Sequence, residues 1–242
     1  MLFSRKFKIR NPYKPDEFVT QELVVTATPT VDYSSVPWVA IDTEYLSFNP
    51  LIDQLCCIQI ASPIADMPEK LAIETIWVYE TLRAGKMSAE YNELLEKLAP
   101  ILDREDIEVL MHVSTSDMPR LQKALGKKFQ GKLFDTKVAG KIVQTNTGAW
   151  GMNDLISQLI DPKFTKDPKL TTSQWDSEPE TWSDNMLEYS LNDVIYLHPL
   201  KEALLRVAER RGTSGLVKDT MAIMPTVCDL FQKGYTENVL SY

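Results

Sequence analysis

The chain has 242 residues, 44% of them hydrophobic and 25% charged, and it carries a formal net charge of −8 at pH 7. Such a length suits one α/β domain with a buried core, and the acidic balance argues against a protein that coats nucleic acid through bulk positive charge. No stretch approaches the roughly 20 apolar residues that span a membrane, and the three cysteines, two of them adjacent, form a poor disulfide framework and suit a cytoplasmic protein.

Residues 1–35 form an N-terminal extension punctuated by prolines, which we expect to be an irregular arm or an edge strand packed on the main domain. Beyond it, short apolar runs predict buried strands. These runs cover residues 38–42, 56–61, 75–79 and 108–112, with a shorter apolar stretch at 133–134. The loop between the first two runs, residues 47–53, is short enough for a hairpin.

Apolar residues at helical spacing predict helices between and after these strands. The segments concerned are 88–102, 117–125, 135–143, 152–160 and 185–211. Ser88 is placed to cap the first helix, Gly126 to end the second, and Pro199 to kink or break the last. Strands followed mostly by helices indicate an α/β fold, in which a mixed β-sheet flanked by helices forms a single domain. We place that domain at residues 36–211 and expect a C-terminal tail, 212–242, to pack on it.

Two carboxylates, Asp42 and Glu44, end the first predicted strand in the pattern D-x-E. Side chains two residues apart in a strand lie on the same face, so both acids point at one place. Their charges repel there unless a cation lies between them. Solvent exposure commonly explains acids at strand ends, so this pair alone is weak evidence for a metal site.

Asp117 follows the predicted strand 108–112 and opens a helix, with Ser114 or Ser116 as its expected cap. An acid in the first turn of a helix is favoured by the helix dipole, which is a purely structural explanation for Asp117. The functional interpretation is a third carboxylate at the end of a strand, close to the first two.

Tyr189 and Asp193 lie four residues apart and therefore share one face of the predicted last helix. A core tyrosine bonded to the aspartate would explain the pair structurally, and a metal would equally satisfy a carboxylate on an inner helix face. Four acids in this order favour phosphodiester hydrolysis. Two hard cations roughly 4 Å apart, held by oxygen ligands, clamp the attacking and leaving oxygens of that reaction.

Four segments carry these residues: VAIDTEY with Asp42 and Glu44, MHVSTSDMPRL with Asp117, LFDTKVAGKIV, and LEYSLNDVIYLHPL with Tyr189 and Asp193. Together they resemble the tyrosine branch of the DEDD 3′→5′ exonuclease superfamily, and within it ribonuclease D. The resemblance implies a ribonuclease-H-like sheet and two divalent cations, Mg²⁺ or Mn²⁺. It also implies that the substrate is a nucleic acid with a free 3′ end, RNA in preference to DNA, from which nucleoside 5′-monophosphates are released.

The resemblance further implies a role for each residue. Asp42, Glu44 and Asp193 would bind the first cation. Asp42 would also bind the second, with Asp117 assisting through water, and Tyr189 would orient the attacking water.

The run KLTTSQWDSEP departs from the family pattern because Trp175 precedes Asp176, which leaves the substrate-positioning contacts unassigned. The loop residues Trp150 and Trp175 could stack on bases or pack locally, and His112 is expected to be structural. Two other functions stay open: a DNA exonuclease of the repair or proofreading type, and a non-catalytic nucleic-acid-binding protein on the same fold, which the loss of an acid would favour.

Overall fold

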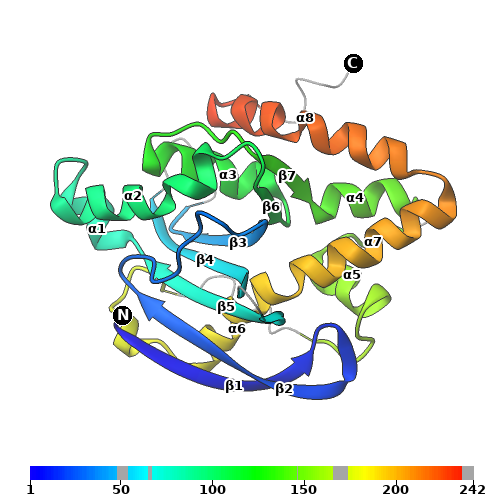
Figure 1. Ribbon diagram of the computed structural model, residues 1–242, viewed down its shortest axis with the longest axis horizontal. Coiled ribbons are helices and arrows are strands. Elements are labelled where there is room, and N and C mark those ends of the chain that lie inside the picture. Colours follow the sequence, from blue (N-terminus) through cyan, green and yellow to red (C-terminus); the bar gives the residue numbers. More distant parts are fainter. Residues whose placement is uncertain (48–53, 65–66, 146, 166–173, 236–242) are drawn as a thin grey trace.

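In the part of the chain that a computed structural model describes, seven strands form one mixed sheet, in the order β1-β2-β5-β4-β3-β6-β7 (Figure 1). The strands are β1 (Phe3–Asn11), β2 (Lys14–Thr26), β3 (Trp38–Tyr45), β4 (Leu55–Ile64), β5 (Met67–Trp77), β6 (Glu108–Met111) and β7 (Lys132–Asp135). The structure describes residues 1–47, 54–64, 67–145, 147–165 and 174–235. Each predicted strand is present, and the antiparallel pairing of β3 with β4 agrees with the expected hairpin, whose loop lies mostly outside the described residues.

Helices flank this sheet and also form most of the C-terminal half of the chain (Figure 1). They are α1 (Tyr79–Ala84), α2 (Ala89–Asp103), α3 (Ser114–Leu125), α4 (Thr136–Val143), α5 (Met152–Leu159), α6 (Asp184–Ile195), α7 (Leu197–Arg211) and α8 (Ser214–Gln232). The mixed sheet with flanking helices confirms the predicted fold class. Among the described residues, no helix has both the length and the apolar character needed to cross a membrane.

The N-terminal extension is not irregular. Strands β1 and β2 form an antiparallel hairpin, and residues Val24–Thr26 of β2 pair in parallel with β5 (Figure 1). In β1 the alternate residues Phe3, Phe7 and Ile9 pack against the core, whereas the cations between them are mostly exposed. This period of two is the signature of a half-buried strand, so the edge-strand alternative is the one that the fold adopts.

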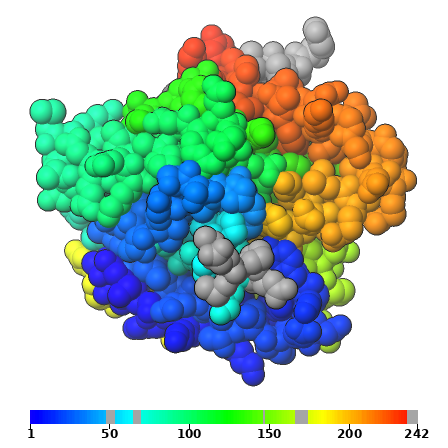
Figure 2. Space-filling view, viewed as in Figure 1, coloured from blue at the N-terminus to red at the C-terminus, as the bar shows by residue number. Residues whose placement is uncertain are grey.

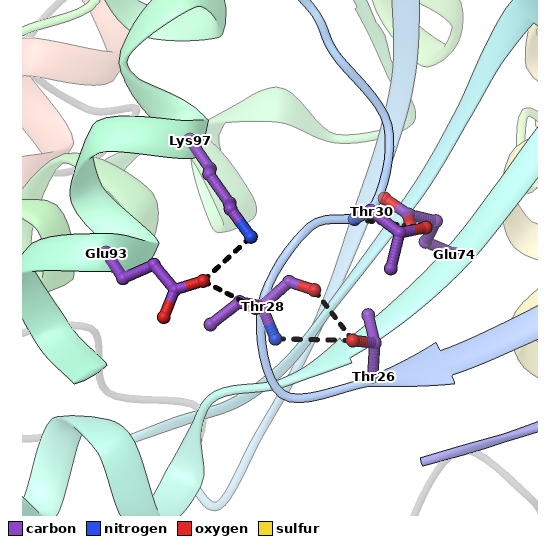
Figure 3. Close-up of polar contacts among 6 residues, drawn as sticks. All are labelled: Thr26, Thr28, Thr30, Glu74, Glu93 and Lys97. Carbon is purple, nitrogen blue, oxygen red and sulfur yellow. Dashed lines mark hydrogen bonds and ion pairs between the residues drawn. The ribbon is translucent and has the colours of Figure 1, made fainter. Parts of the chain in front are cut away.

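Glu74 on β5 fixes the chain that leads from this hairpin to β3. Its buried carboxylate accepts a 2.7 Å hydrogen bond from the Thr30 backbone N–H, a further bond from the Thr30 hydroxyl, and one of 2.8 Å from the Tyr33 hydroxyl. Figure 3 shows the Thr30 contact beside a second set of polar contacts, in which Thr28 bonds to Thr26 and to Glu93 on α2. A buried carboxylate needs such donors, and these hold the start of β3 in place.

Two helix boundaries differ from the prediction. Helix α3 begins after Val113 with no side-chain cap, so neither Ser114 nor Ser116 caps it. The predicted break of the helix over 185–211 is present, but it lies at Tyr196, ahead of Pro199, which is in the first turn of α7. A proline is tolerated there because the first N–H groups of a helix have no partner within the helix. Ser88 and Gly126 do cap α2 and end α3 as expected.

The sheet has two buried faces, and β3 presents alternate residues to each. Ile41 packs with Ile58 and Ile60 against apolar residues of α2 and α3. Helix α6 contacts β3, β4 and β5. Because strand side chains alternate, Asp42 and Glu44 lie on the face opposite Ile41, toward α6. This two-sided burial of β3 places acids from different elements close together at its carboxyl end.

Candidate active site

Asp42 and Glu44 project from the carboxyl-terminal half of β3. The strand pairs with β4 so that Asp42 is opposite Gln59, and the register shifts between Glu44 and Tyr45. The buried Gln59 side chain donates a 3.4 Å hydrogen bond to Glu44 Oε1. Both acids are therefore held on a rigid strand that ends in an irregularity, a feature that is frequent beside active sites.

Helix α6 brings Tyr189 and Asp193 over the same strand. Each of Asp42, Glu44 and Asp193 offers a carboxylate oxygen, and these three oxygens lie within 4.8 Å of one another. Ser190, next to Tyr189, is fully buried, and its hydroxyl lies 3.2 Å from that of Thr75 on β5. That contact fixes the rotation of α6 about its axis, so Tyr189 and Asp193 face the strand acids.

Asp117 reaches the site from the other side of β3, through α3. The residue is 4% exposed, and its carboxylate accepts a 2.5 Å hydrogen bond from the Thr43 hydroxyl. Burial raises the pKa of Asp117 to about 7 in the metal-free protein, and the hydrogen bond from Thr43 opposes that rise. Asp117 is not one of the three clustered acids, although it lines the same cleft.

The start of α3 is supported by a buried acid that is not itself in the cleft. Val113 adopts a left-handed conformation, with φ of 65°, which is uncommon for a β-branched residue. The carboxylate of Asp135 accepts hydrogen bonds of 2.7 Å from the Ser114 backbone N–H and 2.8 Å from the Ser114 hydroxyl. It also caps α4. Asp135 therefore holds the turn from which Asp117 projects.

Arg120 also holds the first turns of α3 in place. It is buried, and its guanidinium lies 3.5 Å from the centre of the Tyr45 ring. It donates to the Ser116 backbone carbonyl and hydroxyl at 2.5 and 3.0 Å, and to the Ser47 carbonyl at 3.1 Å. The Tyr45 hydroxyl lies 3.0 Å from that of Ser116, which completes a packed wall beside Asp117.

All five residues predicted from the sequence line one cleft of about 480 Å³. They are Asp42, Glu44, Asp117, Tyr189 and Asp193. The tertiary structure thus gathers side chains from β3, α3 and α6 that are far apart in the chain. Such a concave site with converging polar groups is the usual form of a catalytic centre.

Comparison with known proteins gives the family. Residues 27–209 match the model of a family described as 3′-5′ exonuclease. The chain belongs to the 3′-5′ exonuclease family.

Ribonuclease D proteins are among the relatives of this exonuclease family member. That of Gluconacetobacter diazotrophicus is 25% identical over 207 residues, which cover 83% of this chain and 47% of that protein. That of Zymomonas mobilis is 27% identical over 188 residues, covering 78% of this chain and 43% of that protein. The chain therefore spans less than half the length of these relatives.

Solved structures of NrnC from Brucella melitensis share the fold along nearly their whole length. NrnC bound to pGG is 29% identical, covers 91% of this chain and 98% of its own, and has a TM-score of 0.72. NrnC with bound Mg²⁺ is 28% identical, with the same coverage and a TM-score of 0.73. The fold shared with these structures agrees with the expected ribonuclease-H-like sheet.

The exonuclease cleft contains residues that the sequence pattern did not assign. Gln174 and Asp176, from the segment that departs from the family pattern, both line it, as does His112. The His112 Nδ1 lies 2.9 Å from the Thr136 hydroxyl, so part of its role is structural, as expected. Only their place in the folded cleft distinguishes Gln174 and Asp176 from other loop residues.

The two loop tryptophans pack locally. Trp175 is 2% exposed and makes an edge contact with Trp182. Trp150 is half-buried, and its indole N–H donates to the Gln144 carbonyl at 3.0 Å. Neither tryptophan is among the residues that line the cleft, and the burial of Trp175 agrees with the local-packing alternative.

The donor set of the cleft fits a hard divalent cation. Its three clustered ligands are carboxylates, Glu44 and Asp193 are buried, and Gln59 bonds the Glu44 carboxylate. Mg²⁺ and Mn²⁺ prefer oxygen ligands of this kind. Three carboxylates so close together also repel one another, and a bound cation relieves that repulsion.

Proposed function

We propose that this chain is a metal-dependent 3′→5′ exoribonuclease that uses two cations and releases nucleoside 5′-monophosphates. The observation that carries this proposal is the meeting of Asp42, Glu44 and Asp193 oxygens within 4.8 Å, in a cleft that Asp117 and Tyr189 also line. Solvent exposure explains isolated surface acids, but it does not explain buried acids converging from a strand and a helix.

Each residue has a proposed task. Asp42, Glu44 and Asp193 would hold one cation, and Asp42 together with Asp117 would hold the second. When bound, divalent cations neutralise phosphate charge and generate a nucleophile from water near neutral pH. The Tyr189 hydroxyl would hydrogen-bond the attacking water and set its direction toward phosphorus.

An RNA substrate with a free 3′ end is supported by the similar proteins. The relatives named ribonuclease D point to RNA, and NrnC, which is similar over almost its full length, has been solved with pGG. Mg²⁺ is the first candidate cation, because NrnC has also been solved with Mg²⁺. A reducing compartment such as the cytoplasm remains a prediction from cysteine usage.

The test uses 5′-labelled single-stranded RNA, structured RNA and single-stranded DNA, incubated with purified protein in Mg²⁺, Mn²⁺ or EDTA. We expect a ladder that shortens from the 3′ end, and nucleoside 5′-monophosphate as product by chromatography. EDTA and Asp42→Asn should both abolish the ladder. Asp184→Asn is the matched control, since it makes the same change on α6 at an exposed position outside the cleft.

Two other functions are separated by the same assay. A rate on single-stranded DNA that exceeds the rate on RNA would favour a DNA exonuclease, because the cation ligands alone do not discriminate a 2′-hydroxyl. No shortening of any substrate by a folded protein in Mn²⁺ would leave a non-catalytic nucleic-acid-binding protein as the better account.

A further inference from the structure

A second hollow, of about 440 Å³, lies beside the catalytic cleft between α1, α2, α3 and the start of β4. Four cations line it: Arg83, Lys86, Arg120 and Lys123. Among the described residues that line it, none is acidic. The whole chain has 34 acids and 26 lysines and arginines, so this local excess of positive charge runs against the overall balance. We refer to this hollow as the basic pocket.

The walls of the basic pocket are held together by polar contacts. The Tyr91 hydroxyl on α2 donates a 2.9 Å hydrogen bond to the Ala124 carbonyl on α3. The Lys86 ammonium lies at the end of α3, where a Cβ added to Gly126 would come within 3.2 Å of it. A cation at that position is favoured by the helix dipole. In Figure 1 helices α1 and α2 lie together at the left, and in Figure 2 they form the shoulder of the molecule on that side.

Three of the four basic side chains lie at the surface of the molecule. Arg83, Lys86 and Lys123 are exposed, whereas Arg120 is buried beneath them. An Arg83 guanidinium nitrogen lies 2.9 Å from a Glu80 carboxylate oxygen. Such a surface ion pair contributes little to stability, so another anion can replace Glu80 as the partner of Arg83. The basic pocket therefore has three exposed positive side chains above one buried guanidinium.

Arg120 connects the basic pocket to the catalytic cleft. Its guanidinium stacks on Tyr45 at 3.5 Å and donates to the Ser116 hydroxyl at 3.0 Å, and both of those residues line the cleft. One layer of side chains therefore separates the two hollows. An RNA strand whose 3′ end occupies the cleft would need to cross only this layer of side chains to reach Lys86 and Lys123.

We propose that the basic pocket binds the phosphodiester backbone of the substrate strand, on the 5′ side of the nucleotide held in the catalytic cleft. This inference rests on the proposed exonuclease function. Lysine and arginine contacts to phosphates are independent of base sequence. Such contacts suit an exonuclease, because it must bind RNA of any sequence while the RNA shortens. The basic pocket also supplies lysine and arginine side chains, whereas the described residues that line the catalytic cleft include neither.

The test measures binding without hydrolysis. Fluorescence anisotropy in EDTA gives the affinity of labelled oligouridylates from two to ten nucleotides long. We expect wild-type protein to bind the ten-nucleotide strand more tightly than the dinucleotide. Lys86→Glu/Lys123→Glu should weaken binding of the ten-nucleotide RNA at least tenfold at 50 mM salt. It should also reduce the ratio of the affinity for the ten-nucleotide RNA to the affinity for the dinucleotide.

A neutral variant and a distant control sharpen the result. Lys86→Gln/Lys123→Gln should reduce the salt dependence, the slope of log K against log salt concentration, by about 1.4, since each phosphate contact on a single strand contributes about 0.7. Arg206→Glu/Lys218→Glu, on exposed positions of α7 and α8, makes the same change in net charge and should leave the affinity unaltered.

Three outcomes would overturn the proposal: wild-type affinity that does not grow with strand length, a pocket variant that binds the ten-nucleotide strand as tightly as wild type, or a loss equal to that of the Arg206→Glu/Lys218→Glu control. Failure of the proposed function is a separate result, because it would appear as wild-type protein that shortens no strand in Mg²⁺ or Mn²⁺. Unfolding curves of each variant in urea confirm that the compared proteins are folded.

Discussion

The Thr43 hydroxyl donates a 2.5 Å hydrogen bond to the carboxylate of Asp117, which is 74 residues away in the chain. Thr43 lies between Asp42 and Glu44 but faces the opposite side of β3. One strand therefore provides two proposed cation ligands on one face and supports a third acid from the other. In the pattern D-T-E, the two acids are the proposed cation ligands, and the threonine between them holds Asp117 in place.

Removing this hydroxyl should impair catalysis without removing any proposed ligand. Thr43→Val keeps the shape of the side chain and leaves Asp117 without its donor. Loss of an outer contact to a metal ligand typically lowers metal affinity or activity about 10- to 100-fold. We expect a fall of that size in kcat/KM on RNA. Thr43→Ser retains the hydroxyl and should stay within a fewfold of wild type; equal activity of all three proteins would show that the bond does not matter.

Asp117 should make the stability of the metal-free protein depend on pH. Its pKa is about 7 in the fold, and about 3.9 is usual in an unfolded chain. The folded state therefore holds an extra proton between these values. The stabilisation associated with it is complete below about pH 4 and is lost as the pH rises toward 7.

Asp117→Asn removes this titration. Urea unfolding in EDTA between pH 4.5 and 8 should show the variant gaining stability relative to wild type as the pH rises, with no further gain above about pH 7. A difference that does not change with pH would contradict the raised pKa of Asp117.

Cation binding should stabilise the fold through the clustered carboxylates. A ligand that binds only the folded state adds about 2.7 kcal/mol to the free energy of unfolding at one hundred times its Kd. We expect Mn²⁺ to raise the stability of wild-type protein in this way and to have almost no effect on Glu44→Gln. Glu188→Gln, an exposed position on α6, is the control and should respond like wild type. An identical response of Glu44→Gln would remove Glu44 from the cation site.

Tyr189→Phe separates water orientation from cation binding. The ring stays in place against the core, but the hydroxyl is lost. General acid–base catalysis by a positioned side chain contributes a factor of about 10²–10⁴, and a hydroxyl that only orients the water contributes less, so we expect kcat to fall by at least about tenfold. Stabilisation by Mn²⁺ should persist in this variant. Unchanged kcat would show that the hydroxyl has no part in the reaction.

Glu74 should matter for stability and not for chemistry. Glu74→Gln replaces one of the two carboxylate oxygens by an NH2 group, so either Thr30 or the Tyr33 hydroxyl loses its acceptor, at a cost of about 1–3 kcal/mol in the free energy of unfolding. The control Glu93→Gln changes an exposed acid paired with Lys97, and we expect less than about 1 kcal/mol. Each effect is measured by urea unfolding, and kcat should remain that of wild type in both.

The sequence by itself indicated the strands, most helices and the set of acids, because each leaves a local signal. Apolar runs mark buried strands, and D-x-E and Y-x-x-x-D place their members on one face of a strand or a helix. For residues 1–35 the sequence did not distinguish an irregular arm from an edge strand. The reason is that β5, with which β2 pairs, lies some 50 residues further along the chain.

Only the tertiary structure decided how these local units meet. Contacts between Thr43 and Asp117, Arg120 and Tyr45, or Ser190 and Thr75 join residues far apart in the chain, and no spacing in a single sequence encodes such a distance. The same holds for the basic pocket, whose cations come from α1, α3 and the turn between α1 and α2. The sequence determines which chemical groups are present, but the distance between two charged groups is set by the packing of the helices and strands that carry them.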